Sequence, residues 1–187
     1  MKNAGDTVGS VIGLVLVSVL GLFAVGASFA VPAPLQVRPG KTSWPMQTGV
    51  VVGGQSGAEF SLLGVQTESL NQAGERIALS YGDRYGNSLK NEPGFYHVSL
   101  DRNARRLVID LAQVSKTTVD PMKLARIMAA SQFVSSSEMT MDPSDGSTNI
   151  TLVLKEPVRF KITVESSGSA RVLIDLERVV QARGRKP

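Results

Sequence analysis

The sequence predicts an all-β fold, a two-sheet β-sandwich built from two sequence-similar halves and preceded by an N-terminal hydrophobic membrane segment. From Phe60 onward, short segments alternate apolar and polar residues with the period of two that is typical of half-buried strands. Clusters of Gly, Pro, Asn, Asp or Ser bound these segments, as expected of hairpin turns. A strand-like sequence also occurs twice, which indicates an internal repeat.

The alternation is clearest in four segments of the chain, which are residues 77–81, 96–100, 150–154 and 160–164. One further segment, residues 121–133, has apolar residues that fit either a helix or a strand, and the sequence leaves both open. The body is therefore predicted to be mostly β.

The repeated strand reads RLVIDL at residues 106–111 and RVLIDL at residues 171–176. The first half is expected to open with residues 60–69 and the second with residues 122–131. Neither half can bury an apolar face alone, so we expect the two to stack face to face around one core. Alternation then turns one set of side chains inward: Leu107, Ile109, Leu111, Val172, Ile174 and Leu176. It turns another set outward: Arg106, Asp110, Arg171 and Asp175.

Residues 8–31 are almost wholly apolar, and a bilayer span takes about 20 such residues. Residues 1–31 are expected to be either a signal peptide cleaved before Val31 or an uncleaved membrane anchor. Both alternatives export the rest of the chain. We therefore expect a periplasmic protein, which is held at the inner membrane if the segment is not cleaved.

The remaining boundaries follow from composition and charge. Residues 32–58 are rich in Pro and Gly and are expected to be a linker, in which residues 50–52 would form at most a short strand. The sandwich is predicted to span residues 59–180, and residues 181–187 form a basic tail. Because the net charge of +4 comes from this tail and the linker, no nucleic-acid partner is expected.

The composition argues against catalysis. The chain has no cysteine and one histidine, His97, which removes thiolate sites, Cys nucleophiles and Ser-His-Asp or multi-His zinc arrangements. Asp110 and Asp175 are expected on opposite sheets, too far apart to act as a carboxylate pair, and each is expected to pair with a cross-strand arginine or a turn. We therefore expect no enzyme activity, no catalytic residues, no metal site and no cofactor.

The duplicated RLVIDL and RVLIDL strands, each after an alternating strand, resemble the AMIN domain, the amidase N-terminal module of bacterial cell envelopes. The resemblance covers about residues 59–180 and includes residues 76–79. It implies a two-sheet sandwich with symmetric halves and a role in targeting to the cell wall, as in peptidoglycan amidases and type IV pilus secretins. No amidase or secretin sequence follows residue 180.

The candidate binding residues are Arg76, Arg106, Arg171, Asp110 and Asp175, all expected on outer sheet faces. Guanidinium groups suit the carboxylates of peptide stems or of a protein partner, and equivalent arginines on two faces would offer two similar sites. The sequence predicts a non-catalytic module that binds peptidoglycan within an envelope assembly. The alternative is a protein–protein adaptor in a periplasmic machine such as a type IV pilus or flagellar apparatus. Few aromatic residues are available to stack on sugars: Tyr81, Tyr85, Phe95 and Tyr96.

Overall fold

The structure is a computed structural model that describes residues 35–37, 43, 45–57, 59–71 and 73–179. The expected membrane segment at residues 8–31 and the basic tail at residues 181–187 lie outside the described residues. Among the described residues, no helix has the length and apolar character needed to cross a membrane.

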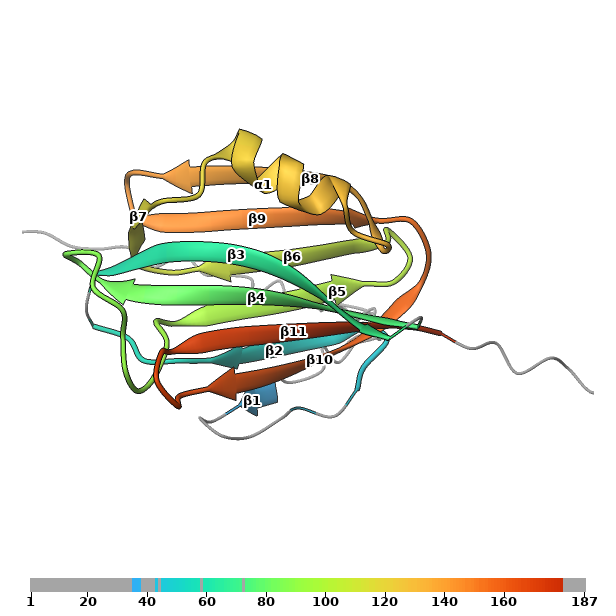
Figure 1. The fold of residues 1–187 in the computed structure, drawn as a ribbon, viewed down its shortest axis with the longest axis horizontal. Coiled ribbons are helices and arrows are strands. Elements are labelled where there is room, and N and C mark those ends of the chain that lie inside the picture. The colour runs from blue at the N-terminus through green and yellow to red at the C-terminus, as the bar shows by residue number, and fades with distance from the viewer. Residues whose placement is uncertain (1–34, 38–42, 44, 58, 72, 180–187) are drawn as a thin grey trace, which may run out of the picture. The chain divides into compact units, whose positions relative to one another are not determined.

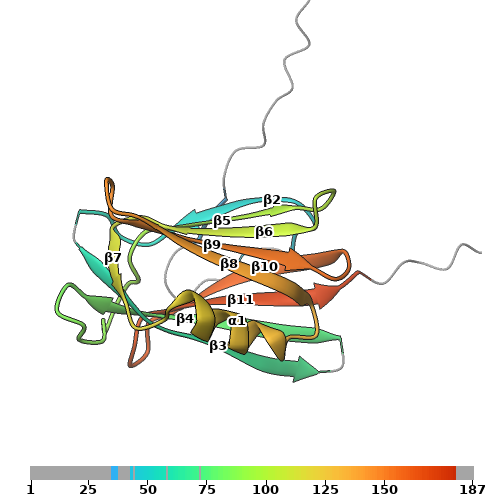
Figure 2. The same ribbon diagram turned by 90° about the horizontal axis from the view of Figure 1, so that it is seen from above.

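Two sheets pack face to face, so the all-β sandwich prediction is confirmed (Figures 1 and 2). Sheet A contains, in spatial order, β1 (Leu35–Val37), β2 (Gly49–Gly53), β5 (Tyr96–Asp101), β6 (Arg106–Leu111), β9 (Ser147–Leu154) and β8 (Val134–Asp142). Sheet B contains β10 (Val158–Glu165), β11 (Arg171–Arg178), β4 (Gly74–Asp83), β3 (Phe60–Asn71) and β7 (Val114–Thr117).

Each sheet combines one hairpin from each half of the sequence. In sheet A, β6 of the β5–β6 hairpin pairs with β9 of the β8–β9 hairpin. In sheet B, β11 of the β10–β11 hairpin pairs with β4 of the β3–β4 hairpin. The β6–β9 and β11–β4 pairs have equivalent registers: Ile109 lies opposite Ile150 in sheet A, and the equivalent Ile174 lies opposite Ile77 in sheet B. The halves therefore interleave instead of stacking as two separate sheets.

The core is filled by the side chains that alternation turns inward. All six aliphatic residues expected inside from the repeated strands are fully buried: Leu107, Ile109, Leu111, Val172, Ile174 and Leu176. Large aromatic side chains complete the core from both sheets: Phe60, Tyr81, Tyr96, Phe133 and Phe160. Burial of this apolar surface is the main source of stability, at roughly 25 cal/mol for each Å² removed from water.

Residues 121–133, whose apolar pattern fits either a helix or a strand, contain a helix, α1 (Pro121–Ala129). Asp120 caps it by accepting a hydrogen bond from the Lys123 backbone N–H at 2.7 Å, and Pro121 occupies the first turn. Leu124 and Met128, one turn apart, are buried. The helix packs against β8 and β3 and covers one side of the sandwich between the two sheets (Figure 2). The second half therefore opens with β8 and not with residues 122–131.

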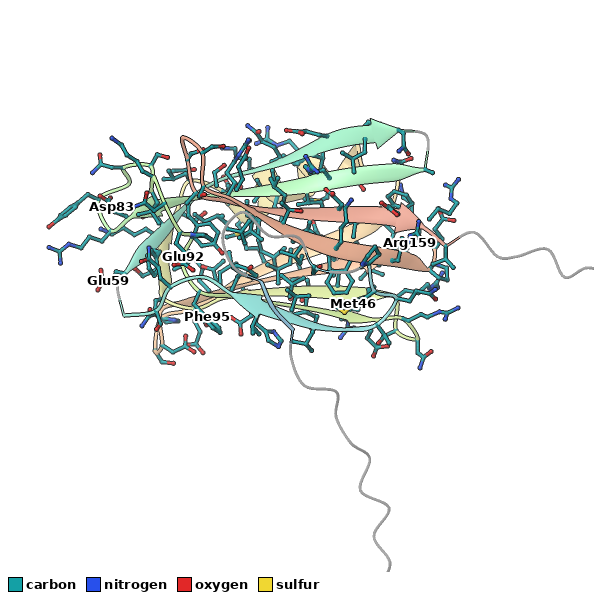
Figure 3. The ribbon with its side chains drawn as sticks, turned by 90° about the horizontal axis from the view of Figure 1, so that it is seen from below. Met46, Glu59, Asp83, Glu92, Phe95 and Arg159 are labelled. Carbon is teal, nitrogen blue, oxygen red and sulfur yellow. The ribbon has the colours of Figure 1, made fainter. Side chains whose placement is uncertain are left out.

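The segment expected to be a linker contributes to both sheets. β2 pairs with β5, and its Val51 is fully buried. Before β2, Met46 exchanges two backbone hydrogen bonds with Phe160 of β10, at 2.8 and 2.7 Å, and is labelled beside that strand in Figure 3. These bonds cover the outer edge of β10, which would otherwise present unpaired backbone groups. The sandwich therefore begins before residue 59. The Pro- and Gly-rich composition did not reveal this, because main-chain hydrogen bonds do not require a particular side-chain pattern.

Candidate functional site

The structure divides the candidate binding residues between two outer faces. Arg106 and Asp110 lie on β6 in sheet A, and both alternate with fully buried neighbours. Arg76 on β4 and Arg171 and Asp175 on β11 lie on the outer face of sheet B. Because the two faces point away from each other across the core, the five residues do not form one site.

Asp175 is held between two cations on the neighbouring strands of sheet B. Arg76 on β4 donates from Nε to Oδ1 at 2.6 Å and from Nη2 to Oδ2 at 3.0 Å. On the other side, Nζ of Lys161 on β10 lies 3.5 Å from Oδ2. The Asp175 side chain is only 1% exposed as a result. The hydrogen bond from Arg76 to Asp175 raises the pKa of the Arg76 guanidinium.

Other charges on the outer face of sheet B are also paired. Arg171 donates from Nε to Oε2 of Glu165 at 2.6 Å. Arg159, labelled in Figure 3, donates from Nε to Oε2 of Glu177 at 2.8 Å. Arg76, Arg171 and Asp175 therefore stabilise the pairing of β4, β10 and β11. Their charged groups are less available to a ligand than the sequence suggested.

The equivalent row of sheet A has different chemistry. Asp110 lies opposite His97 on β5 and Asn149 on β9, in the register that places Asp175 opposite Lys161 and Arg76 in sheet B. Among the described residues, no hydrogen bond or ion pair joins the side chains of His97, Asp110 or Asn149 to another group. All three side chains are half-buried on the outer face. Their carboxylate, amide and imidazole groups are therefore available to a ligand.

The rest of this outer face carries little charge. Half-buried Val52, Ser99, Val108 and Thr151 surround the polar row, and Arg106 is exposed at the end of β6. We call this surface the sheet A face and define it by these side chains: Val52, His97, Ser99, Arg106, Val108, Asp110, Asn149 and Thr151. It presents hydrogen-bonding side chains on β5, β6 and β9, with Val52 of β2 beside them.

Sequence reasoning included Arg106 and Asp110 of this face but missed His97 and Asn149. His97 entered only as the single histidine of the chain, and Asn149 was not considered as a ligand. The repeat is only half of the signal that finds them, because it aligns Asp110 with Asp175 but does not show which residues lie opposite. With the strand pairing known, the two sets of neighbours can be compared, and cations flank one carboxylate only.

Aromatic side chains contribute little to either outer face. Tyr81 and Tyr96 are fully buried, and burial raises the pKa of both phenols. Tyr85 is the exposed tyrosine of the described chain, at 72%, and it lies in the loop after β4 with the Arg84 guanidinium 4.7 Å from its ring centre. Stacking of sugars on aromatic rings is therefore not a feature of the sheet A face.

The described residues contain no cluster of three or more His, Cys, Asp or Glu side chains that would suit a metal ion. A comparison of the sequence with models of known protein families gives no match, and a comparison with curated proteins gives none either. The resemblance to the AMIN domain thus rests on the repeated strands and stays a prediction.

Proposed function

We propose that this chain is a non-catalytic module of the bacterial cell envelope that binds peptidoglycan through the sheet A face. The observation that supports this proposal is the row of His97, Asp110 and Asn149, whose polar groups lack the cross-strand partners that neutralise Asp175 in sheet B. A polar side chain left without partners on a strand surface is suited to hydrogen bonding with a ligand.

The chemistry of the face fits a polymer of sugars and short peptides. The Asp110 carboxylate accepts hydrogen bonds from hydroxyl or amide N–H groups, and the Asn149 amide both donates and accepts. Arg106, exposed at the edge of the row, offers a forked donor to the carboxylates of peptide stems. A face that extends over neighbouring strands of one sheet can contact consecutive units of such a polymer.

The proposal also requires that the module reach the cell wall. The apolar residues 8–31 carry this part of the argument, because both a signal peptide and an anchor would deliver the sandwich to the periplasm. An uncleaved anchor would hold it at the inner membrane, within an envelope assembly.

A second candidate function, a protein–protein adaptor in a pilus or flagellar apparatus, is favoured by a different surface. Met139 and Met141 of β8 and residues 117–121 line an apolar hollow beside β8, a strand at the edge of sheet A. Met141 in this hollow is 46% exposed, and Met122 of α1, which is not part of the lining, is 76% exposed. An extended segment of a partner protein could add to this edge and place an apolar side chain in the hollow.

The test of wall binding is co-sedimentation of the full chain, in a non-ionic detergent, with purified peptidoglycan sacculi. We expect the wild-type chain to pellet with sacculi and the double variant Asp110→Ala, Asn149→Ala to lose most of this binding. Gln66→Ala, at an exposed position on β3 of sheet B, is the matched control and should pellet like the wild type. A wild-type chain that stays in the supernatant at low salt would exclude wall binding and leave the adaptor function.

A further inference from the structure

Glu75 is a carboxylate on the inward face of sheet B. It lies on β4 opposite Leu176 and two residues before Ile77, both of which are fully buried core residues, and it is itself 4% exposed. The equivalent residue of sheet A is Thr148, which lies opposite Leu111. The Thr148 hydroxyl donates a hydrogen bond to the Val114 carbonyl at 2.8 Å. The second half of the chain therefore has a small, satisfied hydroxyl where the first half has a carboxylate.

One oxygen of Glu75 has a structural role. Oε2 accepts a hydrogen bond from the Gln132 backbone N–H at 2.8 Å, and the Gln132 side chain donates to the Gly74 carbonyl at 2.9 Å. These bonds attach the segment after α1 to the start of β4. The other oxygen, Oε1, is buried without a hydrogen-bond partner, and Glu75 forms no ion pair within the described part of the chain. An ionised carboxylate left in this state costs free energy.

A pocket of about 350 Å³ adjoins this carboxylate, at the end of the sandwich where the β3–β4 hairpin and the C-terminus of α1 lie (Figure 1). Its lining residues are Thr67, Glu68, Ser69, Glu75, Ala130 and Gln132. They include the buried Glu75 carboxylate and the hydroxyls of Thr67 and Ser69, which lie on the same face of the sheet as Glu75. Glu68 alternates to the outer face, where it lies opposite Arg76 and the two charges interact. The C-terminal end of α1 adds the negative end of a helix dipole.

From these observations we infer that the pocket binds a primary ammonium group at the end of a short alkyl chain, as in a lysine or another diamino acid. An ammonium has three N–H donors that point in different directions, which suits acceptors dispersed over Glu75 and the hydroxyls of Thr67 and Ser69. A planar guanidinium fork suits a carboxylate with two free oxygens, whereas Oε2 of Glu75 already accepts the Gln132 N–H. The volume lies at the lower end of the range for small-molecule pockets, about 300–1,000 Å³, and so favours a short side chain.

The inference is independent of wall binding through the sheet A face, because the pocket lies on the β3–β4 side of the molecule. Two sources of ligand share the required chemistry. One is the free amine on the peptide stems of peptidoglycan, and the other is a lysine side chain of a partner protein.

The first experiment is isothermal titration calorimetry of the full chain, in a non-ionic detergent, with n-butylammonium chloride. We expect saturable binding that is absent with the neutral probe N-butylacetamide. Equal heats from the two probes, or no saturation with the ammonium, would overturn the inference.

Single substitutions test whether the acceptor groups of the pocket bind the ammonium. Glu75→Gln keeps an acceptor for the Gln132 N–H but removes the charge, and we expect the affinity for n-butylammonium to fall about tenfold. Ser69→Ala, at an exposed position in the pocket lining, removes one hydroxyl acceptor and should weaken binding about threefold. Glu59→Gln, exposed and outside the pocket lining, is the control and should bind like the wild type. Wild-type affinity in a folded Glu75→Gln variant, or in Ser69→Ala if Glu75→Gln does not fold, would overturn the inference.

A last comparison identifies the source of the ammonium. The stem-type peptide L-Ala–D-Glu–L-Lys–D-Ala and its all-L isomer, both acetylated at the N-terminus so that lysine carries the only ammonium, are titrated in parallel, each with a free and an acetylated lysine side chain. Binding of both free peptides supports a lysine of a protein partner, and preference for the stem-type peptide supports peptidoglycan. Binding that survives acetylation would contradict an ammonium pocket.

Discussion

The guanidinium of Arg76 and the carboxylate of Asp175 form a two-bond ion pair between neighbouring strands, with distances of 2.6 and 3.0 Å. The Asp175 side chain is 1% exposed and that of Arg76 is 27% exposed, so the pair lies at the boundary between solvent and protein. Such pairs gain from geometry and partial burial, and the loss of one partner leaves an uncompensated charge.

We expect Arg76→Ala to lower the free energy of unfolding by about 3 kcal/mol, because Asp175 would keep only the more distant Lys161 as a partner. Arg171→Ala removes a more exposed pair with Glu165 and should cost at most about 1 kcal/mol. Urea denaturation of both variants measures the difference. Equal losses would show that burial of Asp175 does not set the strength of its ion pair.

Much of the fold could be predicted from the sequence because strand alternation reports which side chains face the core. The period of two in residues 106–111 and 171–176 correctly identifies the aliphatic residues that fill the core, although Leu173 and Asp175, at outward positions of β11, are buried as well. The same pattern says nothing about which strands are neighbours. The interleaving of hairpins depends on contacts distant in sequence, such as β6 with β9 and β4 with β11, and alternation does not encode them.

The candidate site was harder to predict for the same reason. The burial of Asp175 arises from Arg76 and Lys161, which reach it only through strand pairing across long sequence separations. Its equivalent, Asp110, has the same local sequence but different neighbours. The helix at residues 121–129 was ambiguous because a short apolar pattern fits two periods, and Asp120 with Pro121 were the capping signals that distinguish them.

The buried phenol of Tyr81 predicts an unusual response to substitution. Its hydroxyl has no hydrogen-bond partner within the described chain, so Tyr81→Phe removes a buried polar atom without breaking a bond. We expect the variant to be as stable as the wild type at pH 7, or more stable by up to about 1 kcal/mol, in urea denaturation. A large loss of stability would show that the hydroxyl has a partner after all. Tyr85→Phe, at an exposed position, is the control.

The same burial predicts sensitivity to alkali. The pKa values of Tyr81 and Tyr96 are raised above the ordinary 10.0 in the folded state, so above that pH the unfolded chain loses phenolic protons first. Stability is therefore fully present below about pH 10 and falls as pH rises, by up to about 1.4 kcal/mol per pH unit for each tyrosine. Denaturation at several pH values should give a shallower decline for Tyr81→Phe than for the wild type. Parallel declines would contradict the raised pKa of Tyr81.

Two glycines before β3 allow the cost of backbone strain to be distinguished from the cost of a steric clash. Gly54 and Gly57 both have positive φ, 83° and 96°, so alanine is strained at either position. A Cβ at Gly54 would also lie 2.2 Å from the Gly94 carbonyl oxygen, whereas one at Gly57 would meet nothing within 4 Å. We expect Gly57→Ala to cost about 1 kcal/mol and Gly54→Ala about 3 kcal/mol or more. Equal thermal stabilities of the two variants would show that the 54–94 contact relaxes freely.

Arg106 and Arg171 occupy equivalent positions in the repeated strands and provide a matched pair for the binding proposal. Arg106 is exposed on the sheet A face and, among the described residues, takes part in no ion pair, whereas Arg171 is bound to Glu165 on sheet B. Equivalent arginines on two faces were expected to offer two similar sites, but the pairing of Arg171 favours one. We therefore expect Arg106→Ala to weaken sacculus binding about threefold to tenfold and Arg171→Ala to leave it unchanged.

Co-sedimentation of the full chain over a range of salt concentrations measures this difference. Binding of the wild type should fall as salt rises, because exposed charges are screened beyond about 8–10 Å, and the Arg106→Ala variant should show a weaker salt dependence. The free energy of unfolding of Arg106→Ala should stay within about 0.5 kcal/mol of the wild type, which separates lost binding from lost structure. If Arg171→Ala reduced binding as much as Arg106→Ala, the wall contacts would extend to sheet B, and the sheet A face would not be the binding site.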